Sequence, residues 1–228
     1  MKTNPGCRYR GRLMGLRGLM GLAMLAGMAG AAWSQPASHP NLNAQLLVAA
    51  RSGDIKGVQR ALEQGAAPNS RNRLGKTALL MAAEKGQLPL AELMLRAGTD
   101  VNLATVDGIT PLMAACFSGK APIVKRLLDQ GAKVEPVDRE KRSAMVYAAG
   151  LGHAEVMTLL LDAGVPLDQR YEHDLTALMW AAGQGHEAAV KLLLARGADP
   201  ALRDDRGLTA GAMARQGSHG ALLALLPP

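Results

Sequence analysis

The chain has 228 residues, of which 48% are hydrophobic and only 3% aromatic, and 26 basic residues stand against 19 acidic ones. This length is enough for one or two domains, and a core with so few aromatic residues favours closely packed small helices over a sheet, since sheets are rich in aromatic and β-branched side chains. The excess of positive charge lies mainly at the N-terminus, so it gives little reason to expect a nucleic-acid-binding protein.

Residues 1–34 have the order of a secretory signal peptide. Basic residues and no acid occupy residues 1–17, and an uncharged apolar run follows at 18–32. Small residues then mark a cleavage site, which we expect after Ser34 or, as the second choice, after Ala32. This order predicts an exported protein, located in the periplasm of a bacterium.

Two alternatives stay open for this segment. The apolar run is short for a membrane span, which needs about 20 residues, but an uncleaved N-terminus would leave a membrane-tethered protein. Met14 could also be the true start, with Arg17 as the positive region. Cleavage after Ser34 leaves 21 basic and 19 acidic residues, a net charge of +2, and a single cysteine. We therefore expect neither a nucleic-acid partner nor a membrane contact for the mature chain.

Beyond a short linker at 35–41, the sequence repeats every 33 residues. Phrases such as "GKTALLMAAEKGQ" and "GITPLMAACFSGK" begin without a slip at Gly75, Gly108, Lys141, Asp174 and Gly207. A hydroxyl residue recurs two positions after each start, and an alanine recurs five positions after the hydroxyl. With a degenerate unit upstream, the domain at 42–228 holds six units. Their approximate bounds are 42–71, 72–104, 105–137, 138–170, 171–203 and 204–228.

Each unit is predicted to form a helix, a turn, a second helix and a loop. In the third unit Thr110 can cap the first helix, and Pro111 suits the first helical position. This helix is about eight residues long and ends near Gly119. The second helix, residues 121–130, carries four apolar residues on one face, and the glycine after it suits a positive φ. The apolar residues are Ile123, Val124, Leu127 and Leu128.

These phrases resemble the ankyrin repeat, whose signature runs roughly G-x-T-P-L-H-x-A-A, then G-H, a Leu-Leu pair and G-A-D. The nearest matches are "GITPLMAA" at 108–115, "GHEAAVKLLLARGADP" at 185–200 and "LMLRAGTDVN" at 93–102. The resemblance covers residues 42–226 and implies an all-α ankyrin-repeat solenoid. It also implies a non-catalytic scaffold that binds another protein, as an accessory or regulator of an envelope or periplasmic protein.

The signature histidine is absent from every unit. Its positions hold Leu80, Met113, Val146, Met179 and Ala212. Some hydrogen bonds that tether the hairpin loops in the family are therefore expected to be lost.

The sequence offers few candidates for chemistry. Three histidines, His153, His186 and His219, lie 33 residues apart, and equivalent positions of stacked helices are about 10 Å apart, too far to share one metal ion. We interpret them as structural, and Cys116 as a buried small side chain. We expect no enzyme activity, cofactor, metal or small-molecule substrate. The alternative is a metal-handling or enzymatic protein that uses histidine, methionine and Cys116.

The four aromatic residues left after cleavage map to the concave surface by which ankyrin repeats bind. Phe117 lies seven residues after its hydroxyl, and Tyr147 and Trp180 lie four after theirs, so all three share one helix face. Tyr171 begins a hairpin. We expect none of the four in the Leu/Ala core; the alternative is sideways packing against adjacent repeats. The hairpin residues predicted around them are Arg73, Lys76, Asp107, Ile109, Arg139, Glu140, Arg142, Glu172, His173 and Leu175.

Arg139, Arg142 and the nearby Lys141 form a basic cluster on one hairpin. It could attract an acidic partner, or it could be a solvated loop.

Overall fold

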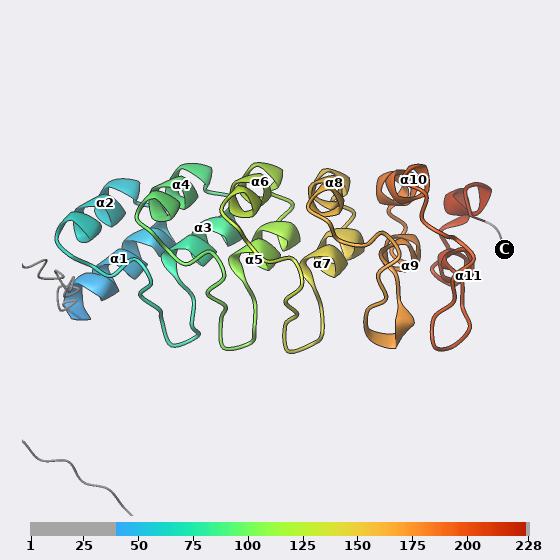
Figure 1. Ribbon diagram of the computed structural model, residues 1–228, viewed down its shortest axis with the longest axis horizontal. Helices are drawn as coiled ribbons and strands as arrows, with labels where there is room; N and C mark the ends of the chain where they lie inside the picture. Colours follow the sequence, from blue (N-terminus) through green and yellow to red (C-terminus); the bar gives the residue numbers. More distant parts are fainter. Residues whose placement is uncertain (1–39, 227–228) are drawn as a thin grey trace, which may run out of the picture. The chain divides into compact units, whose positions relative to one another are not determined.

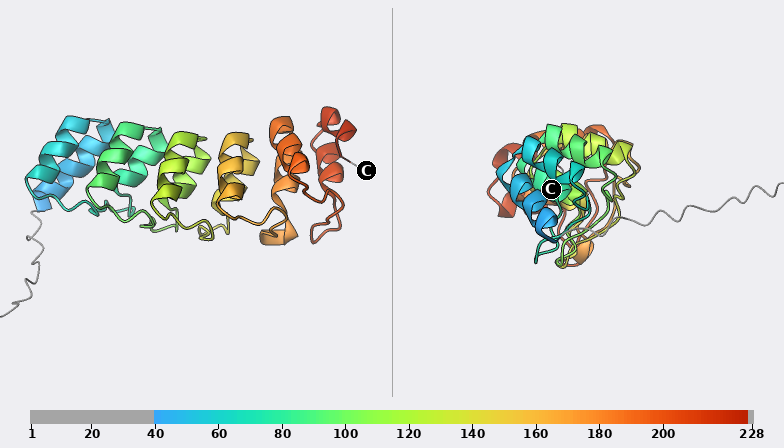
Figure 2. Two further views of the ribbon diagram at one scale, coloured as in Figure 1. Left: turned by 45° about the horizontal axis from the view of Figure 1, so that its top comes forward. Right: turned by 90° about the vertical axis from the view of Figure 1, so that its left-hand side faces the viewer.

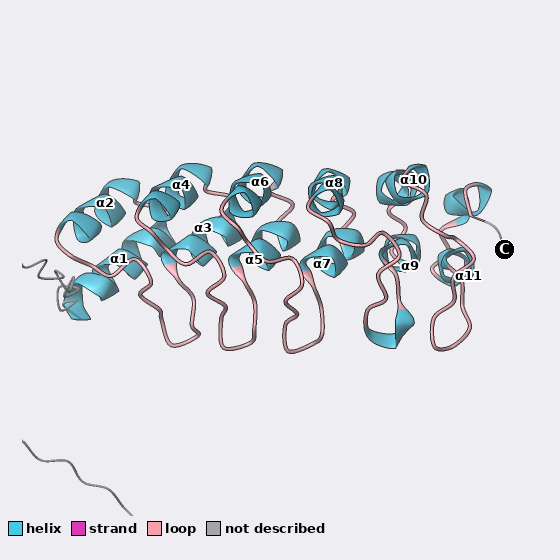
Figure 3. Ribbon diagram, in the orientation of Figure 1, coloured by secondary structure: helices cyan, strands magenta, loops and turns pink. Residues whose placement is uncertain are grey.

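A computed structural model describes residues 40–226, which form helical hairpins stacked side by side (Figure 1). This part of the chain contains eleven α-helices and two short 3₁₀ helices and no β-strand (Figure 3). The predicted all-α repeat solenoid is confirmed. No helix in this range has the length and hydropathy of a membrane span. The signal peptide predicted at 1–34 and Pro227, predicted to stop the last helix, lie outside the described residues.

Each unit places its first helix on the hairpin side of the stack and its second helix on the opposite side (Figure 1). The first helices are α1 (Pro40–Ser52), α3 (Ala78–Lys85), α5 (Pro111–Phe117), α7 (Ala144–Gly150), α9 (Ala177–Gly183) and α11 (Ala210–Gln216). The second helices are α2 (Ile55–Glu63), α4 (Leu88–Arg96), α6 (Ala121–Asp129), α8 (Ala154–Asp162) and α10 (Glu187–Ala195). The last unit ends instead in a 3₁₀ helix, Gly220–Ala224, and another, Glu172–Asp174, forms a hairpin tip. Helix α1 begins at Pro40, inside the segment predicted as a linker.

The recurring hydroxyl residue precedes the first helix of every repeat except the first. All five side chains are buried, and each oxygen accepts a hydrogen bond, at 3.1–3.3 Å, from the backbone N–H three residues later. This bond satisfies one of the backbone donors that a helix leaves free at its N-terminus. The five caps are Thr77, Thr110, Ser143, Thr176 and Thr209.

Replacing one cap tests how much it contributes. We expect Thr110→Ala to lower the free energy of unfolding by about 1 kcal/mol, because the buried N–H of Met113 loses its acceptor. Thr110→Ser keeps the oxygen and should retain most of the stability. Urea unfolding followed by circular dichroism measures both, and equal losses would contradict the capping role.

The core consists of alanines between the helices and longer apolar chains at their centres. The recurring alanine is fully buried in all five units, which lets neighbouring first helices pack closely. In α6, Ile123, Val124 and Leu127 are buried as predicted, while Leu128 is half-buried at the edge. The recurring alanines are Ala82, Ala115, Ala148, Ala181 and Ala214.

The three spaced histidines connect consecutive units. The Nε2 atom of His153 lies 3.2 Å from the carbonyl oxygen of Phe117, and that of His186 lies 2.9 Å from the carbonyl of Gly150. His219 contacts the carbonyl of Gly183 in the same way, at 3.1 Å. Each bond satisfies a carbonyl at the end of the preceding first helix, which supports the structural role predicted for these residues.

Candidate functional site

The loops between units form five hairpins that lie side by side under the first helices (Figures 1 and 2). A backbone bond of 2.9–3.1 Å closes the base of each, as between the N–H of Asp138 and the carbonyl of Arg142. In four of the five hairpins, the side chain of the first residue also accepts hydrogen bonds from the hairpin backbone. The oxygens of Asn72, Asp138 and Asp204 each accept two backbone N–H groups, and that of Thr105 accepts one.

These side chains tether the hairpins independently of the signature histidine. These four hairpins are therefore tethered although the signature histidine is absent, because short Asn, Asp and Thr side chains can fold back onto nearby backbone N–H groups. The fifth hairpin begins with Tyr171, which makes no such bond.

Bonds also join one hairpin to the next. The N–H of Val106 donates to the carbonyl of Leu74 at 3.1 Å, and the N–H of Arg139 donates to the carbonyl of Asp107 at 2.9 Å. The side chains of Arg139 and Asp107 form an ion pair at 3.1 Å as well. Farther along, the Nδ1 atom of His173 lies 2.8 Å from a carboxylate oxygen of Asp205.

Asp138 is the centre of a buried polar cluster. Its carboxylate accepts a hydrogen bond from the Tyr147 hydroxyl and pairs with the Arg142 guanidinium at 3.1 Å. The guanidinium carbon of Arg142 also lies 4.9 Å from the centre of the Tyr147 ring, a cation–π contact. Burial alone would raise the pKa of Asp138, but these bonds stabilise the carboxylate and the net effect lowers it. Burial and the bond to Asp138 raise the pKa of Tyr147 to about 12.

The lowered pKa of Asp138 has a consequence for acid stability, shared by Asp204, whose pKa is lowered against burial by bonds from Leu208 and Arg206. Because both groups hold protons more weakly when folded, their contribution is complete above the unfolded pKa, about 3.9, and is lost as pH falls through the folded values. We expect unfolding free energy to fall below about pH 4, less steeply in Asp138→Asn. Urea unfolding across this range measures both slopes, and identical slopes would contradict the assignment.

Phe117 is exposed beside this cluster, with 57% of its surface accessible. Its ring meets the edge of Tyr147 at a centroid distance of 5.7 Å and an angle of 84°, a favourable T-shaped geometry. The two rings form part of a groove of about 490 Å³ between the hairpins and the first helices. We call this the aromatic groove. Its other main contributors are Lys76, Glu84, Ile109, Met113 and Arg142.

The remaining aromatic residues lie elsewhere. Trp180 is half-buried in a separate groove of about 360 Å³, where it packs against the core, and Tyr171 lies in a third hollow. The prediction that none of the aromatics belongs to the core was wrong for Tyr147, which is only 9% exposed. The four aromatic residues therefore do not form one surface. In the aromatic groove only Phe117 is exposed, and the buried Tyr147 packs against it.

The predicted hairpin residues are mostly paired within the protein. Lys76 forms an ion pair with Glu84 at 2.6 Å, and Arg142 pairs with Glu140 at 2.8 Å as well as with Asp138. Ile109 and Leu175 pack half-buried against the core, whereas Arg73 is exposed. Since Arg139 and Arg142 already contact acids, they give little support for an acidic partner.

Cys116 is buried, and burial raises the pKa of its thiol. A nucleophilic cysteine needs a lowered pKa and access, so this environment is that of a structural residue. Within residues 40–226, no three histidine, cysteine or acidic side chains are grouped as metal ligands would be.

Sequence reasoning missed Asp138, although a signal for it existed. Aligning the units by their 33-residue period places Asn72, Thr105, Asp138, Tyr171 and Asp204 in one column. Four of these five residues are short and polar, which indicates a turn tether.

Comparison with known protein families matches residues 46–138 and 132–204 to ankyrin repeats (3 copies). The chain belongs to the ankyrin-repeat family. A search of curated proteins found no match. Ankyrin repeats generally mediate contacts between proteins, and in this chain the hairpins and first helices of the repeats provide the aromatic groove.

Proposed function

We propose that this protein is a non-catalytic scaffold of the bacterial periplasm, which binds a partner protein through the aromatic groove. The observation that carries the proposal is the exposure of Phe117 beside Tyr147 in a groove formed by three repeats. Large aromatic side chains are typical anchors of protein interfaces, and charged groups around them are typical of the rim. Its role would be accessory: to stabilise, inhibit or position an envelope or periplasmic protein.

The groove is preorganised for such a contact. Tyr147 is held by Asp138 and Arg142, and it supports the Phe117 ring from the side. The hairpin that carries Arg142 is tied to the preceding hairpin through Arg139. A surface that is already ordered loses little conformational entropy when a partner binds.

Export is proposed from the sequence alone. The basic segment, apolar run and small residues of 1–34 have the order of a signal peptide. The mature chain would keep one cysteine, Cys116, so it could form no internal disulfide even in an oxidising compartment. The intact mass of the exported protein distinguishes cleavage after Ser34 or Ala32 from a retained membrane anchor.

The binding proposal is tested by affinity capture from periplasmic extract with residues 35–228 as bait. We expect one protein to be enriched, and Phe117→Ala to weaken its binding by about 2 kcal/mol, or roughly 30-fold. Tyr147→Ala is unsuitable for this purpose, because it would also disrupt the buried bond to Asp138.

Val48→Ala is the matched control. Val48 is 58% exposed, close to the value for Phe117, but it lies on α1 outside the groove. Equal capture by all three baits would leave protein binding in place and refute the aromatic groove as its site. Failure of all baits to enrich a protein would contradict the scaffold proposal itself.

A further inference from the structure

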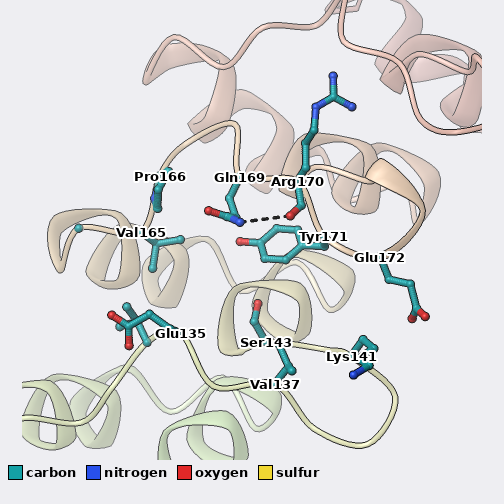
Figure 4. Close-up of a pocket in the computed structure, with 12 residues that line it drawn as sticks. Glu135, Val137, Lys141, Ser143, Val165, Pro166, Gln169, Arg170, Tyr171 and Glu172 are labelled. Carbon is teal, nitrogen blue, oxygen red and sulfur yellow. Dashed lines mark hydrogen bonds between the residues drawn. The ribbon is translucent and has the colours of Figure 1, made fainter.

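A crevice lies between the hairpin of the fourth repeat and that of the fifth (Figure 4). It measures about 680 Å³, within the range of about 300–1,000 Å³ typical of ligand sites. Its walls come from two stretches of loop and hairpin, residues 134–143 and 164–172, and are mainly apolar. The apolar side chains are Val134, Val137, Val165, Pro166 and the ring of Tyr171.

A hairpin-to-hairpin bond is missing at this crevice. At the other three junctions between hairpins, a backbone N–H donates a hydrogen bond to the carbonyl 32 positions earlier. The donors are residues 106, 139 and 205, and the acceptors are residues 74, 107 and 173 respectively. The equivalent groups here are the N–H of Glu172 and the carbonyl of Glu140. Neither makes a hydrogen bond with any residue between 40 and 226.

A second series of bonds is also broken here. In the loops after the second helices, the N–H groups of Asp100, Lys133 and Asp199 donate to side-chain oxygens 31 positions earlier, at 2.8–3.2 Å. The equivalent donor in the crevice is Pro166, which has no N–H, and the equivalent acceptor is Glu135 in place of the shorter Asn or Asp. The two walls of the crevice therefore lack both kinds of hydrogen bond that join the loops of neighbouring repeats elsewhere.

We attribute the missing bond to the side chain of Lys141. At the same position of the second and third repeats stand Gly75 and Gly108, both with positive φ. A Cβ added at Gly75 would lie 3.0 Å from the backbone nitrogen of Val106, and one added at Gly108 would lie 3.2 Å from the Cα of Asp138. Lys141 has the same left-handed backbone, φ 59°, but carries a Cβ, so a hairpin packed in the same way would have to shift outward by a few tenths of an ångström.

The fifth repeat has Asp174 at this position and still bonds to the sixth, but its tip is built differently. There His173 and Asp174 are both left-handed and form a 3₁₀ turn. A side chain at this position is therefore compatible with the bond to the next hairpin when the tip is a 3₁₀ turn, as in the fifth repeat.

Tyr171 also leaves an unsatisfied group in the crevice. Its hydroxyl is buried and has no hydrogen-bond partner among the described residues. The Ser143 hydroxyl opposes the effect of burial on the pKa of Tyr171, which still rises to about 12, but the two hydroxyls do not meet hydrogen-bond geometry. Buried polar groups are almost always satisfied, so this hydroxyl is available to a polar group that enters the crevice.

We propose that the crevice binds an extended segment of a partner polypeptide. The segment would add main-chain bonds to the free N–H of Glu172 and the free carbonyl of Glu140, as a peptide does at the edge of a sheet. One of its apolar side chains would enter between Val137 and Val165, and its backbone would supply a partner for the Tyr171 hydroxyl. This second site is separate from the aromatic groove and does not rest on it.

The charges of the crevice define the segment further. Glu135, Glu172 and Lys141 make no ion pair within residues 40–226, whereas Arg170 lies 3.8 Å from Asp174 and its guanidinium points away from the crevice (Figure 4). The unpaired charges therefore sum to one negative charge. This favours a segment in which a basic residue stands next to the apolar one.

The test is selection of random linear peptides displayed on phage, on the wild-type protein with Lys141→Gly in solution as a competitor. Glycine removes the Cβ, so the variant should close the crevice, restore the bond between residues 172 and 140, and slow hydrogen exchange of the Glu172 amide. We expect peptides with an apolar residue beside Lys or Arg. Fluorescence polarisation should show about tenfold or greater loss of affinity in Lys141→Gly.

Lys141→Ala is the matched control, because it keeps the Cβ and removes the rest of the side chain together with its ammonium group. It should bind a basic peptide at least as tightly as the wild type, since loss of the ammonium group makes the crevice more negative. Phe117→Ala, which alters only the aromatic groove, should bind within about threefold of the wild type. The proposal is overturned if no peptide is enriched, if Lys141→Gly binds equally well, or if its Glu172 amide still exchanges fast. Peptides lost with Phe117→Ala but not with Lys141→Gly would overturn the crevice and support the aromatic groove instead.

Discussion

Leu127→Ala is expected to lower the free energy of unfolding by about 3 kcal/mol. Leu127 is fully buried in α6, near the middle of the stack, where α4 and α8 pack on either side. Its truncation removes apolar contact and leaves a cavity that the neighbouring helices fill only in part. Because domains are stable by only about 5–15 kcal/mol, this is a large share of the total. Guanidinium unfolding followed by circular dichroism measures the loss.

Leu128→Ala provides the matched control, since it is the same substitution one position along the same helix. Leu128 is half-buried, so we expect it to lose less than about half as much. Equal losses from the two variants would contradict the burial that the structure assigns to the two side chains.

Asp138→Ala is expected to cost about 3 kcal/mol, although it removes no apolar contact. The substitution leaves the Tyr147 hydroxyl without its acceptor, and it also frees the backbone N–H groups of Glu140 and Arg142. Polar groups that stay buried without a partner cost far more than the net value of the bonds they made. Urea unfolding measures the effect, and the loosened hairpin should also weaken any partner bound at Phe117.

A double-mutant cycle isolates the buried bond. Tyr147→Phe alone leaves the carboxylate of Asp138 with Arg142 but removes the hydroxyl. If Asp138 and Tyr147 act together, the double variant should lose clearly less than the sum of the single losses. Simple additivity would show that the tether and the tyrosine are independent.

The period, the helices and the caps could be predicted because they depend on neighbours in the sequence. Thr110 caps the helix that begins at the next residue, and Ile123, Val124 and Leu127 share a face through helical spacing alone. Such features recur from repeat to repeat, so the same prediction is made independently in several repeats.

The burial of Tyr147 could not be predicted in this way. It depends on Asp138, which stands nine residues earlier on a hairpin, and on Phe117 in the preceding repeat. The related position in the next repeat shows the effect of the neighbour. There Trp180 packs over Gly150, which stands where the preceding unit has Phe117. Similar aromatic residues at one repeat position thus have different surroundings.

The crevice was visible in the sequence only as departures from the period. Lys141 replaces a glycine and Tyr171 replaces a short polar residue, and each alone reads as ordinary variation. Their effect comes from the approach of two backbones that are far apart in the chain, which no local pattern contains.

The fourth and fifth repeats are bonded to each other on one side only, and we expect this to affect how the stack bends. The helices of the fourth and fifth repeats stay joined, through the ion pair of Arg196 with Asp162 at 2.9 Å and through His186. Their hairpins are not joined by the bond that links the others. Repeats one to four and repeats five and six are therefore connected at this junction through their helices but not through their hairpins. We expect the curvature of the solenoid to change most easily there, so that a partner filling the crevice would set the angle between these two groups of repeats.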